Sequence, residues 1–332
     1  MSSTTRTAAE GLDVPARRLP VPQTPSPQMQ QLIASPLRSG WRVLPQSAEE
    51  WRVLVEAAAQ ATRQALPGLI ARMKVTVEPT LIDGVRAFIV SPESVPAANR
   101  RRLLMHLHGG CYVFGPGEAG LPEAVMMAGF GGFRVISVDY RMPPEAYFPA
   151  ALEDGVRVYA EAIKSTAAKR VGVFGTSAGG ALTLAIVLRA KQMGIALPAA
   201  IAPGTPMSDV TKVGDTFYTN ELIDNVLISR DGLCDAAAKV YAAGHDLQDP
   251  LISPVYGDLS GFPPAILTSG TRDLLLSNTV RVHRKLRQAG VEAVLQVFEG
   301  QSHAHYLFDD SAPETHEVFA EISAFFDRYL ER

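Results

Sequence analysis

A serine between two glycines is the residue of this chain whose setting best suits nucleophilic chemistry. Ser177 lies in the stretch Gly-Thr-Ser-Ala-Gly, residues 175–179, after an apolar strand-like run and before a segment with helical apolar spacing. Glycines allow a sharp strand-to-helix turn in which the serine hydroxyl projects into a cleft, an arrangement called a nucleophile elbow. The pattern predicts that Ser177 attacks a carbonyl carbon.

A serine hydroxyl is a weak nucleophile, so a base must accept its proton and a carboxylate must orient that base. Asp273 follows the strand-like run 263–270, and His303 and His305 follow the run 293–298. We predict that Asp273 is the orienting acid and His303 the base, because the order Ser, Asp, His is typical of α/β-hydrolases. Asp139 precedes the serine and fits that order less well.

The candidate oxyanion hole lies upstream of the serine. The strand-like run 103–107 leads into His-Gly-Gly-Cys-Tyr at residues 108–112, where glycines expose backbone amides. We expect the amides of Gly109, Gly110 and Ala178 to stabilise the oxyanion formed during acyl transfer. Loss of one such donor typically costs about 3 kcal/mol of transition-state stabilisation.

With these residues identified, the chain resembles the hormone-sensitive-lipase-like family of α/β-hydrolase esterases from about residue 101 to the C-terminus. The Asp-Tyr-Arg-x-x-Pro-Glu segment at 139–145, the Asp-Pro and Ser-Pro pairs at 249–254 and the Gly-x-x-His pattern at 300–303 carry the resemblance. It implies that Ser177, Asp273 and His303 are catalytic, with His303 preferred over His305. It also implies ester hydrolysis without a metal or an organic cofactor.

Two positions depart from the common pattern of that family. Cys111 stands where most members have a third glycine, so its side chain borders the expected oxyanion loop. Thr176 stands where many relatives have aspartate, which resembles the branch written Gly-Thr-Ser-Ala-Gly. Neither change removes the expected mechanism.

The spacing of the elements predicts an α/β-hydrolase fold, with a mostly parallel central sheet, helices on both faces and a helical cap. We expect strands near residues 103, 134, 171, 199, 265 and 293, preceded by a pair at 75–90 that turns at Asp83-Gly84. Residues 1–74 are expected to form a flexible start followed by cap-forming helices at 28–37 and 48–65. Residues 75–332 are expected to form the catalytic domain.

The insertion at about 207–262 is the expected source of a cap or pocket, although plain packing of its helices on the sheet explains its apolar residues equally well. We take Cys111, Tyr112, Phe217, Tyr218 and His305 as the candidates for pocket residues.

Composition excludes some partners. The chain has 332 residues, a net charge of −3 and a pI near 6.2, which gives no indication of nucleic-acid binding. No apolar run is long enough for a membrane span, and no secretory signal is evident, so we expect a cytoplasmic location. Cys111 and Cys234 are too far apart in the sequence to indicate a disulfide framework or a metal site. A homodimer is left open.

Together these features predict a serine carboxylesterase that acts on a small molecule, a short- to medium-chain acyl ester or a lactone. Two alternatives remain. A receptor-like relative would use the pocket only to bind a ligand, and an amidase or acyltransferase would use the same three side chains.

Overall fold

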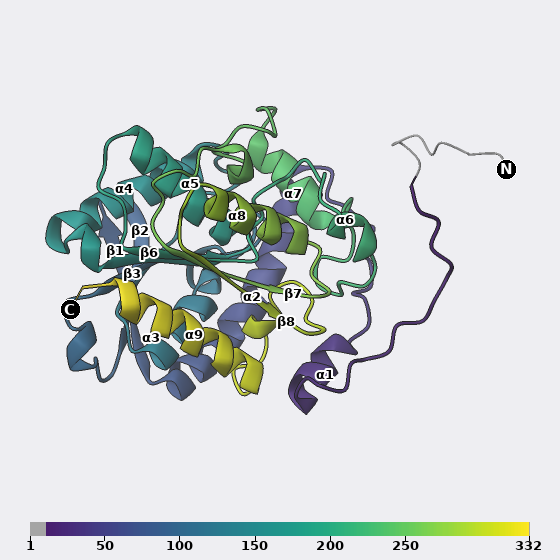
Figure 1. The fold of residues 1–332 in the computed structure, drawn as a ribbon, viewed down its shortest axis with the longest axis horizontal. Coiled ribbons are helices and arrows are strands. Elements are labelled where there is room, and N and C mark those ends of the chain that lie inside the picture. Colours follow the sequence, from purple (N-terminus) through teal and green to yellow (C-terminus); the bar gives the residue numbers. More distant parts are fainter. Residues whose placement is uncertain (1–10, 332) are drawn as a thin grey trace.

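The structure, a computed structural model, describes residues 11–331 and places one eight-stranded sheet at its centre (Figure 1). The predicted mostly parallel sheet with helices on both faces is confirmed. The strands are β1 Val75–Ile82, β2 Val85–Pro92, β3 Leu103–Leu107, β4 Val135–Val138, β5 Val171–Thr176, β6 Ala200–Gly204, β7 Ala265–Gly270 and β8 Ala293–Phe298.

The strand order is β1-β2-β4-β3-β5-β6-β7-β8. β1 and β2 form an antiparallel hairpin that turns at Asp83 and Gly84, β2 pairs antiparallel with β4, and the pairs from β4 to β8 are parallel. The carboxyl ends of β5, β7 and β8 therefore lie at one edge of the sheet, where ligand sites of such sheets form.

Helices flank the strands. Their bounds are α1 Pro27–Ile33, α2 Ala48–Met73, α3 Pro122–Gly131, α4 Ala150–Ser165, α5 Ala178–Gln192, α6 Thr216–Thr219, α7 Leu233–Ala242, α8 Leu276–Gln288 and α9 Pro313–Tyr329. α1 ends four residues before the predicted boundary, because Pro36 disfavours helical backbone in the residue before it. α2 continues past the predicted end at residue 65 and includes Pro67.

Two layers of helices cover the sheet. α4, α5 and α8 lie on one face and α3 and α9 on the other (Figure 1). β5 is buried along its whole length, with Val171 and Val173 in the core on the first face and Phe174 in the core on the second. An all-apolar run is what a strand buried on both faces requires.

The segment between β6 and β7 contains only the short helices α6 and α7 and a turn of 3₁₀-helix at Pro254–Tyr256. The helix α2 packs against α3. The division of the chain into a cap-forming segment 1–74 and a catalytic domain 75–332 stays a prediction. The expected flexible start of the chain includes residues 1–10, which lie outside the described residues.

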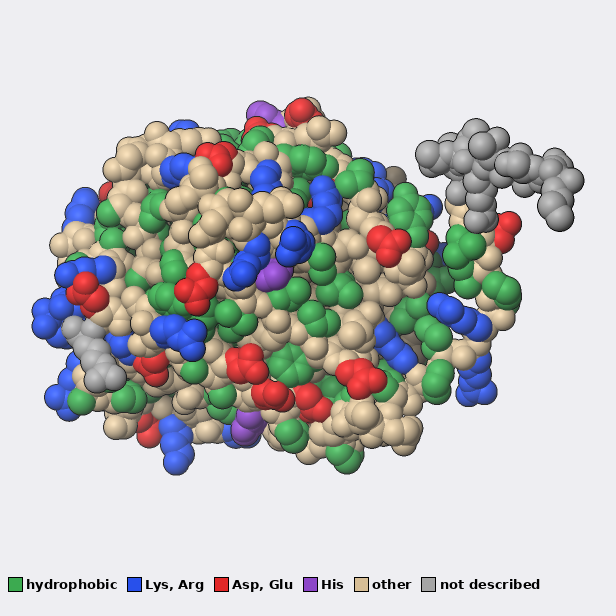
Figure 2. Space-filling view, viewed as in Figure 1, with side chains coloured by type: hydrophobic (Ala, Val, Ile, Leu, Met, Phe, Trp, Pro, Cys, Tyr) green, Lys and Arg blue, Asp and Glu red, His purple; other side chains and the backbone are tan. Residues whose placement is uncertain are grey.

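On the face drawn in Figure 2, acidic and basic side chains are interspersed among apolar ones. Within residues 11–331, no helix is both long enough and apolar enough to cross a bilayer.

Candidate active site

Ser177 sits at the junction of β5 and α5 with a strained backbone. Its φ of 63° and ψ of −121° lie in a region that non-glycine residues rarely adopt. Hydrogen bonds hold it on both sides, because its amide donates to the Gly204 carbonyl at 2.9 Å and its carbonyl accepts from Met207 at 3.0 Å. The serine therefore has the geometry of a nucleophile elbow.

The glycines of the elbow permit a close approach to the end of β3. A Cβ at Gly175 or at Gly179 would overlap the carbonyl oxygen of Leu107. At Gly109 a Cβ would come within 3.4 Å of the Cβ of Ser177. The absence of side chains at these positions lets the serine and the loop after β3 lie against each other.

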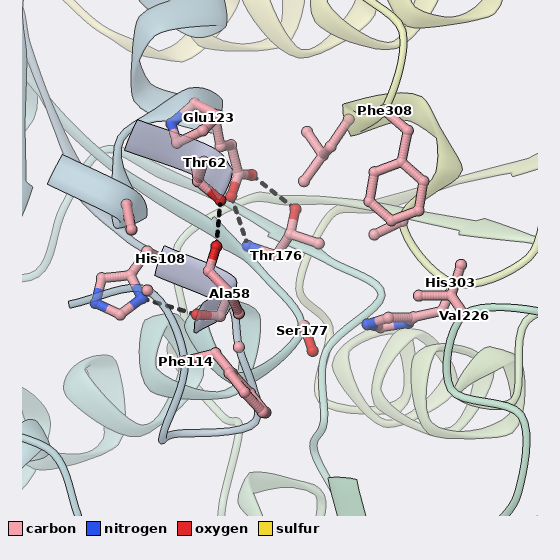
Figure 3. A pocket seen from close by; sticks show the side chains of 18 of the residues that line it. Ala58, Thr62, His108, Phe114, Glu123, Thr176, Ser177, Val226, His303 and Phe308 are labelled. Carbon is pink, nitrogen blue, oxygen red and sulfur yellow. Dashed lines mark hydrogen bonds between the residues drawn. The ribbon is translucent and has the colours of Figure 1, made fainter. Parts of the chain in front are cut away.

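A buried carboxylate under the elbow was not found by the sequence analysis. Glu123 of α3 accepts hydrogen bonds from the Thr176 hydroxyl at 2.7 Å and the Thr176 amide at 3.2 Å (Figure 3), and lies 3.1 Å from Nε2 of His106. The Thr176 hydroxyl also lies 2.7 Å from the hydroxyl of Tyr306. Thr176, which distinguishes the Gly-Thr-Ser-Ala-Gly pattern, therefore has hydrogen-bond partners in α3 and in the loop after β8.

Asp273 and His303 are brought together by the loops after β7 and β8. Nδ1 of His303 lies 3.1 Å from Oδ1 of Asp273, and both side chains are buried. His305 instead bonds the carboxamide of Asn225 at 2.9 Å through Nε2 and accepts from the Ser302 amide through Nδ1. The structure therefore places His303, and not His305, next to the predicted acid.

Asp273 has further donors that keep it ionised. It accepts from the hydroxyl of Thr205, from the Ser269 hydroxyl at 2.9 Å and from the Leu275 amide at 2.8 Å. Burial by itself would raise its pKa, but His303 and these donors outweigh burial, so the pKa of Asp273 lies below its ordinary value. Thr205 lies in no recognisable motif, so no local pattern could have identified it.

The same interactions raise the pKa of His303. Burial by itself lowers its pKa, but the charge and hydrogen bond of Asp273, together with the charge of Asp224, outweigh burial. The pKa of His303 therefore lies above its ordinary value. This raised pKa favours the protonated imidazolium form, which a histidine that acts as general base must adopt during the reaction.

Ser177 and His303 face each other across the cavity in Figure 3, with the imidazole ring directed toward the serine side chain. Between these two described side chains there is no hydrogen bond. Catalytic hydrogen bonds are often long in substrate-free enzymes and shorten when the substrate binds.

The loop after β3 presents amides without acceptors. Among the described residues, no hydrogen-bond partner is found for the amides of Gly109, Gly110, Cys111 and Ala178. His108 organises this loop by bonding the Gly109 carbonyl at 2.7 Å, and burial lowers its pKa to about 4, so the ring is neutral near pH 7. The amides of the three predicted oxyanion donors and of Cys111 are thus without a backbone acceptor among the described residues.

Cys111 and Cys234 form a disulfide with a Cα–Cα distance of 5.3 Å, so the expectation that two cysteines so distant in the sequence form no disulfide is wrong. The bond joins the loop after β3 to α7 across 123 residues of sequence. Only the tertiary fold brings the two residues together. Beside the bond, the rings of Tyr112 and Tyr241 stack at 4.0 Å.

A cavity of about 810 Å³ opens at Ser177. Its lining is mostly apolar and comes from α2, the loop after β3, α3, the segment 226–234 and the loop after β8. It includes Ala58, Ala65, Leu66, Leu69, Phe114, Met126, Val226, Leu227, Ile228, Leu233 and Phe308. A volume of this size holds a small organic molecule.

Of the five predicted pocket residues, Cys111 alone lines this cavity within the described part of the chain. Tyr112 is buried against α7, and His305 is buried by its bond to Asn225. Tyr218 is 60% exposed, and Phe217 lines a separate small cavity. Apolar spacing identified these segments but not the direction in which each side chain points, so four of these five predictions are wrong.

Across residues 11–331, no three His, Cys, Asp or Glu side chains are grouped so that they could hold a metal ion.

Comparisons with known proteins identify the fold. Residues 104–307 match the model of a family described by the α/β-hydrolase fold. An acetyl-hydrolase of Streptomyces hygroscopicus is 29% identical over 69% of this chain and 77% of its own length.

Two crystal structures of esterases extend the match. One is 40% identical, with a TM-score of 0.93, and the alignment covers 97% of this chain and 99% of that one. The other, an esterase from the bacterial hormone-sensitive lipase family, is 26% identical, with a TM-score of 0.78 and coverage of 92% and 99%. The chain therefore belongs to the α/β-hydrolase family, among its hormone-sensitive-lipase-like members, and is a carboxylesterase.

Proposed function

We propose that this carboxylesterase hydrolyses short- to medium-chain acyl esters or lactones through an acyl-enzyme formed on Ser177. The observation that carries the proposal is the placement of His303. Its Nδ1 bonds Asp273, and its ring is directed toward Ser177 (Figure 3). A serine, a histidine and an aspartate in this arrangement support the proposal, because serine hydrolases use these three groups.

In the first half-reaction, Nε2 of His303 takes the proton of Ser177 as the serine oxygen bonds to the ester carbon. The carbonyl electron pair moves onto the oxygen, where the amides of Gly109, Gly110 and Ala178 donate to it. When the intermediate collapses, the bond to the alcohol breaks, and the leaving alcohol takes the proton from His303.

In the second half-reaction, water attacks the acyl carbon and gives a proton to His303. The new tetrahedral intermediate collapses, the bond to the serine oxygen breaks, and Ser177 recovers its proton from His303. Asp273 stays ionised throughout and stabilises the imidazolium in both halves.

The substrate class is proposed from the cavity. Its wall on α2 includes small side chains such as Ala58 and Ala65, and the lining is mostly apolar, so an acyl chain of several carbons can be buried there. The names of the relatives support acyl esters, and the acetyl-hydrolase among them supports a short chain.

The test is steady-state hydrolysis of p-nitrophenyl esters from acetate to palmitate, of lactones and of anilides, by the native chain and by Ser177→Ala. We expect kcat for the variant to fall by on the order of 10⁶-fold. Ser165→Ala, which removes a serine hydroxyl at the end of α4 away from the cavity, is the matched control and should retain native activity.

The outcomes separate the alternatives. Unchanged activity in Ser177→Ala would refute the proposed nucleophile, and preference for emulsified long-chain triglycerides would refute the proposed substrate class. Binding of one ester per chain without release would favour a receptor. Faster cleavage of anilides would favour an amidase, and acyl transfer to an added alcohol in preference to water would favour an acyltransferase.

A cytoplasmic location and a homodimer stay predictions. Gel filtration with light scattering tests the latter.

A further inference from the structure

A second buried carboxylate lies behind the proposed acid and base. Asp224, between α6 and α7, has no exposed surface. Its Oδ1 accepts from the amides of Val226 at 2.8 Å and Leu227 at 3.1 Å, which lie on its own segment. Within residues 11–331, it forms no ion pair with lysine or arginine.

Its other oxygen bonds the two loops that carry the proposed acid and base. Oδ2 accepts from the amide of Leu274 at 2.9 Å, next to Asp273, and from the amide of His303 itself at 3.3 Å. One carboxylate thus joins three segments that meet only in the folded chain. An ionised carboxylate can accept four such bonds, whereas an amide side chain can accept at only one of its two positions.

Neighbours of Asp224 strengthen the same junction. The carboxamide of Asn220 donates to the carbonyl of Asp273 at 2.9 Å and to that of Thr271 at 3.2 Å. The amide of Asn225 donates to the Ser302 hydroxyl at 3.2 Å. Residues 220–225 are therefore attached to the loop after β7 and to the loop after β8.

We propose that Asp224 is a positioning residue that fixes His303 and the loop of Asp273 and stabilises the imidazolium formed during acyl transfer. This inference rests on the proposed function of Ser177, His303 and Asp273. Asp224 does not touch the reacting atoms, and it acts on the substrate only through these groups.

The charges around Asp224 support the second part of that role. The ionisable groups that face it are Asp273 from the loop after β7 and His303 from the loop after β8. His305 instead bonds Asn225, and Glu221 on the same segment as Asp224 bonds Ser229. Burial and the nearby Asp273 raise the pKa of Asp224 to about 6, and His303 opposes that rise. In return, the charge of Asp224 raises the pKa of His303.

The test compares Asp224→Asn with Asp209→Asn in the full chain, with p-nitrophenyl acetate as the substrate. Asp209 is the matched control, because it is an equally buried carboxylate of the same insertion whose partners are Thr211, Tyr256 and Arg281 and not the proposed triad. Thermal unfolding of both variants shows the fraction that is folded at the assay temperature.

For Asp224→Asn we expect kcat to fall between about tenfold and about a hundredfold with little change in KM, because small displacements of reacting groups cost rate. We also expect the acid limb of kcat/KM to move to lower pH, since His303 loses a negative neighbour. Asp209→Asn should lose stability but keep the native pH profile and native kcat per folded molecule.

A second variant tests the position of the carboxylate apart from its charge. Asp224→Glu keeps the charge and moves it by one methylene, so kcat should fall while the acid limb stays at its native pH. Native kcat in this variant would overturn the positioning role, whether or not Asp224→Asn folds.

The failure of this inference differs from the failure of the proposed function. If the native chain does not hydrolyse the ester, the proposed function fails. If the native chain is active and the acid limb and kcat of Asp224→Asn match those of Asp209→Asn, the function stands and the role of Asp224 is overturned.

Discussion

The disulfide between Cys111 and Cys234 gives a prediction about stability that can be separated from activity. A cross-link lowers the entropy of the unfolded chain by an amount that grows with the length of the closed loop. For a separation of 123 residues, the chain-entropy model gives a stabilisation of about 5 kcal/mol. Reduction should therefore lower the free energy of unfolding by up to that amount.

Activity should change much less than stability. Cys111 directly follows Gly110 in the proposed oxyanion loop, so loss of the bond frees one side of that loop. The stacked rings of Tyr112 and Tyr241 still join the same loop to α7 after reduction. Since an aromatic pair contributes about 0.5–1.5 kcal/mol beyond its buried area, we expect the folded, reduced enzyme to keep kcat within about threefold of the oxidised enzyme.

The assay is urea unfolding followed by tryptophan fluorescence, with and without a phosphine reductant, alongside thiol titration and ester hydrolysis below the unfolding transition. The control is the double variant Cys111→Ala with Cys234→Ala, whose unfolding midpoint should not respond to reductant. Two titratable thiols in the untreated native protein, or the same midpoint in both conditions, would refute the reasoning. The bond is also at odds with the expected cytoplasmic location, because disulfides persist mainly in oxidising compartments.

Three further predictions concern the site and its cavity. Gly179→Ala should lower both the free energy of unfolding and kcat, because the new Cβ would overlap the Leu107 carbonyl. This loss is expected although alanine is favoured over glycine in helices by about 1 kcal/mol. A variant that is more stable in urea unfolding would contradict this prediction. Glu123→Ala should lower the free energy of unfolding by about 3 kcal/mol or more, since it leaves the buried amide and hydroxyl of Thr176 short of acceptors. Glu123→Gln should lower the free energy of unfolding by less. Equal losses in the two variants would argue against this reason. Ala65→Phe should reduce kcat/KM for octanoyl esters at least about tenfold more than for acetyl esters, because it fills the wall of the cavity on α2; an unchanged chain-length profile would show that the acyl chain binds elsewhere.

Much of the central sheet and the turn that carries Ser177 could be predicted, because local sequence patterns determine them. Strands buried on both faces, such as β5, require near-continuous apolar runs, and a serine flanked by glycines can be recognised without its neighbours in space. The loops after β7 and β8 supplied Asp273 and His303 because these loops follow strongly apolar strands. Each of these predictions depended on residues close together in the chain.

The supporting residues could not be predicted in this way, because their partners are distant in the sequence. Thr205 meets Asp273 across 68 residues, and Asp224 meets His303 across 79. Glu123 alone left a signal, since it is an acidic residue in the first turn of the apolar helix α3, whose residues 123–128 are all buried. A charge at such a position requires buried partners, and these are Thr176 and His106.

These supports explain how the elbow keeps a backbone conformation that is unfavourable in isolation. A non-glycine residue in the region occupied by Ser177 costs about 1–3 kcal/mol. Against that cost stand the bond from the Ser177 amide to Gly204, the bond from Met207 to its carbonyl, and two bonds from Thr176 to Glu123. At about 0.5–1.5 kcal/mol for a neutral bond and more for a bond to a carboxylate, these four interactions together exceed the strain. The serine hydroxyl therefore stays directed into the cavity before any substrate binds, and binding energy need not be used to turn it.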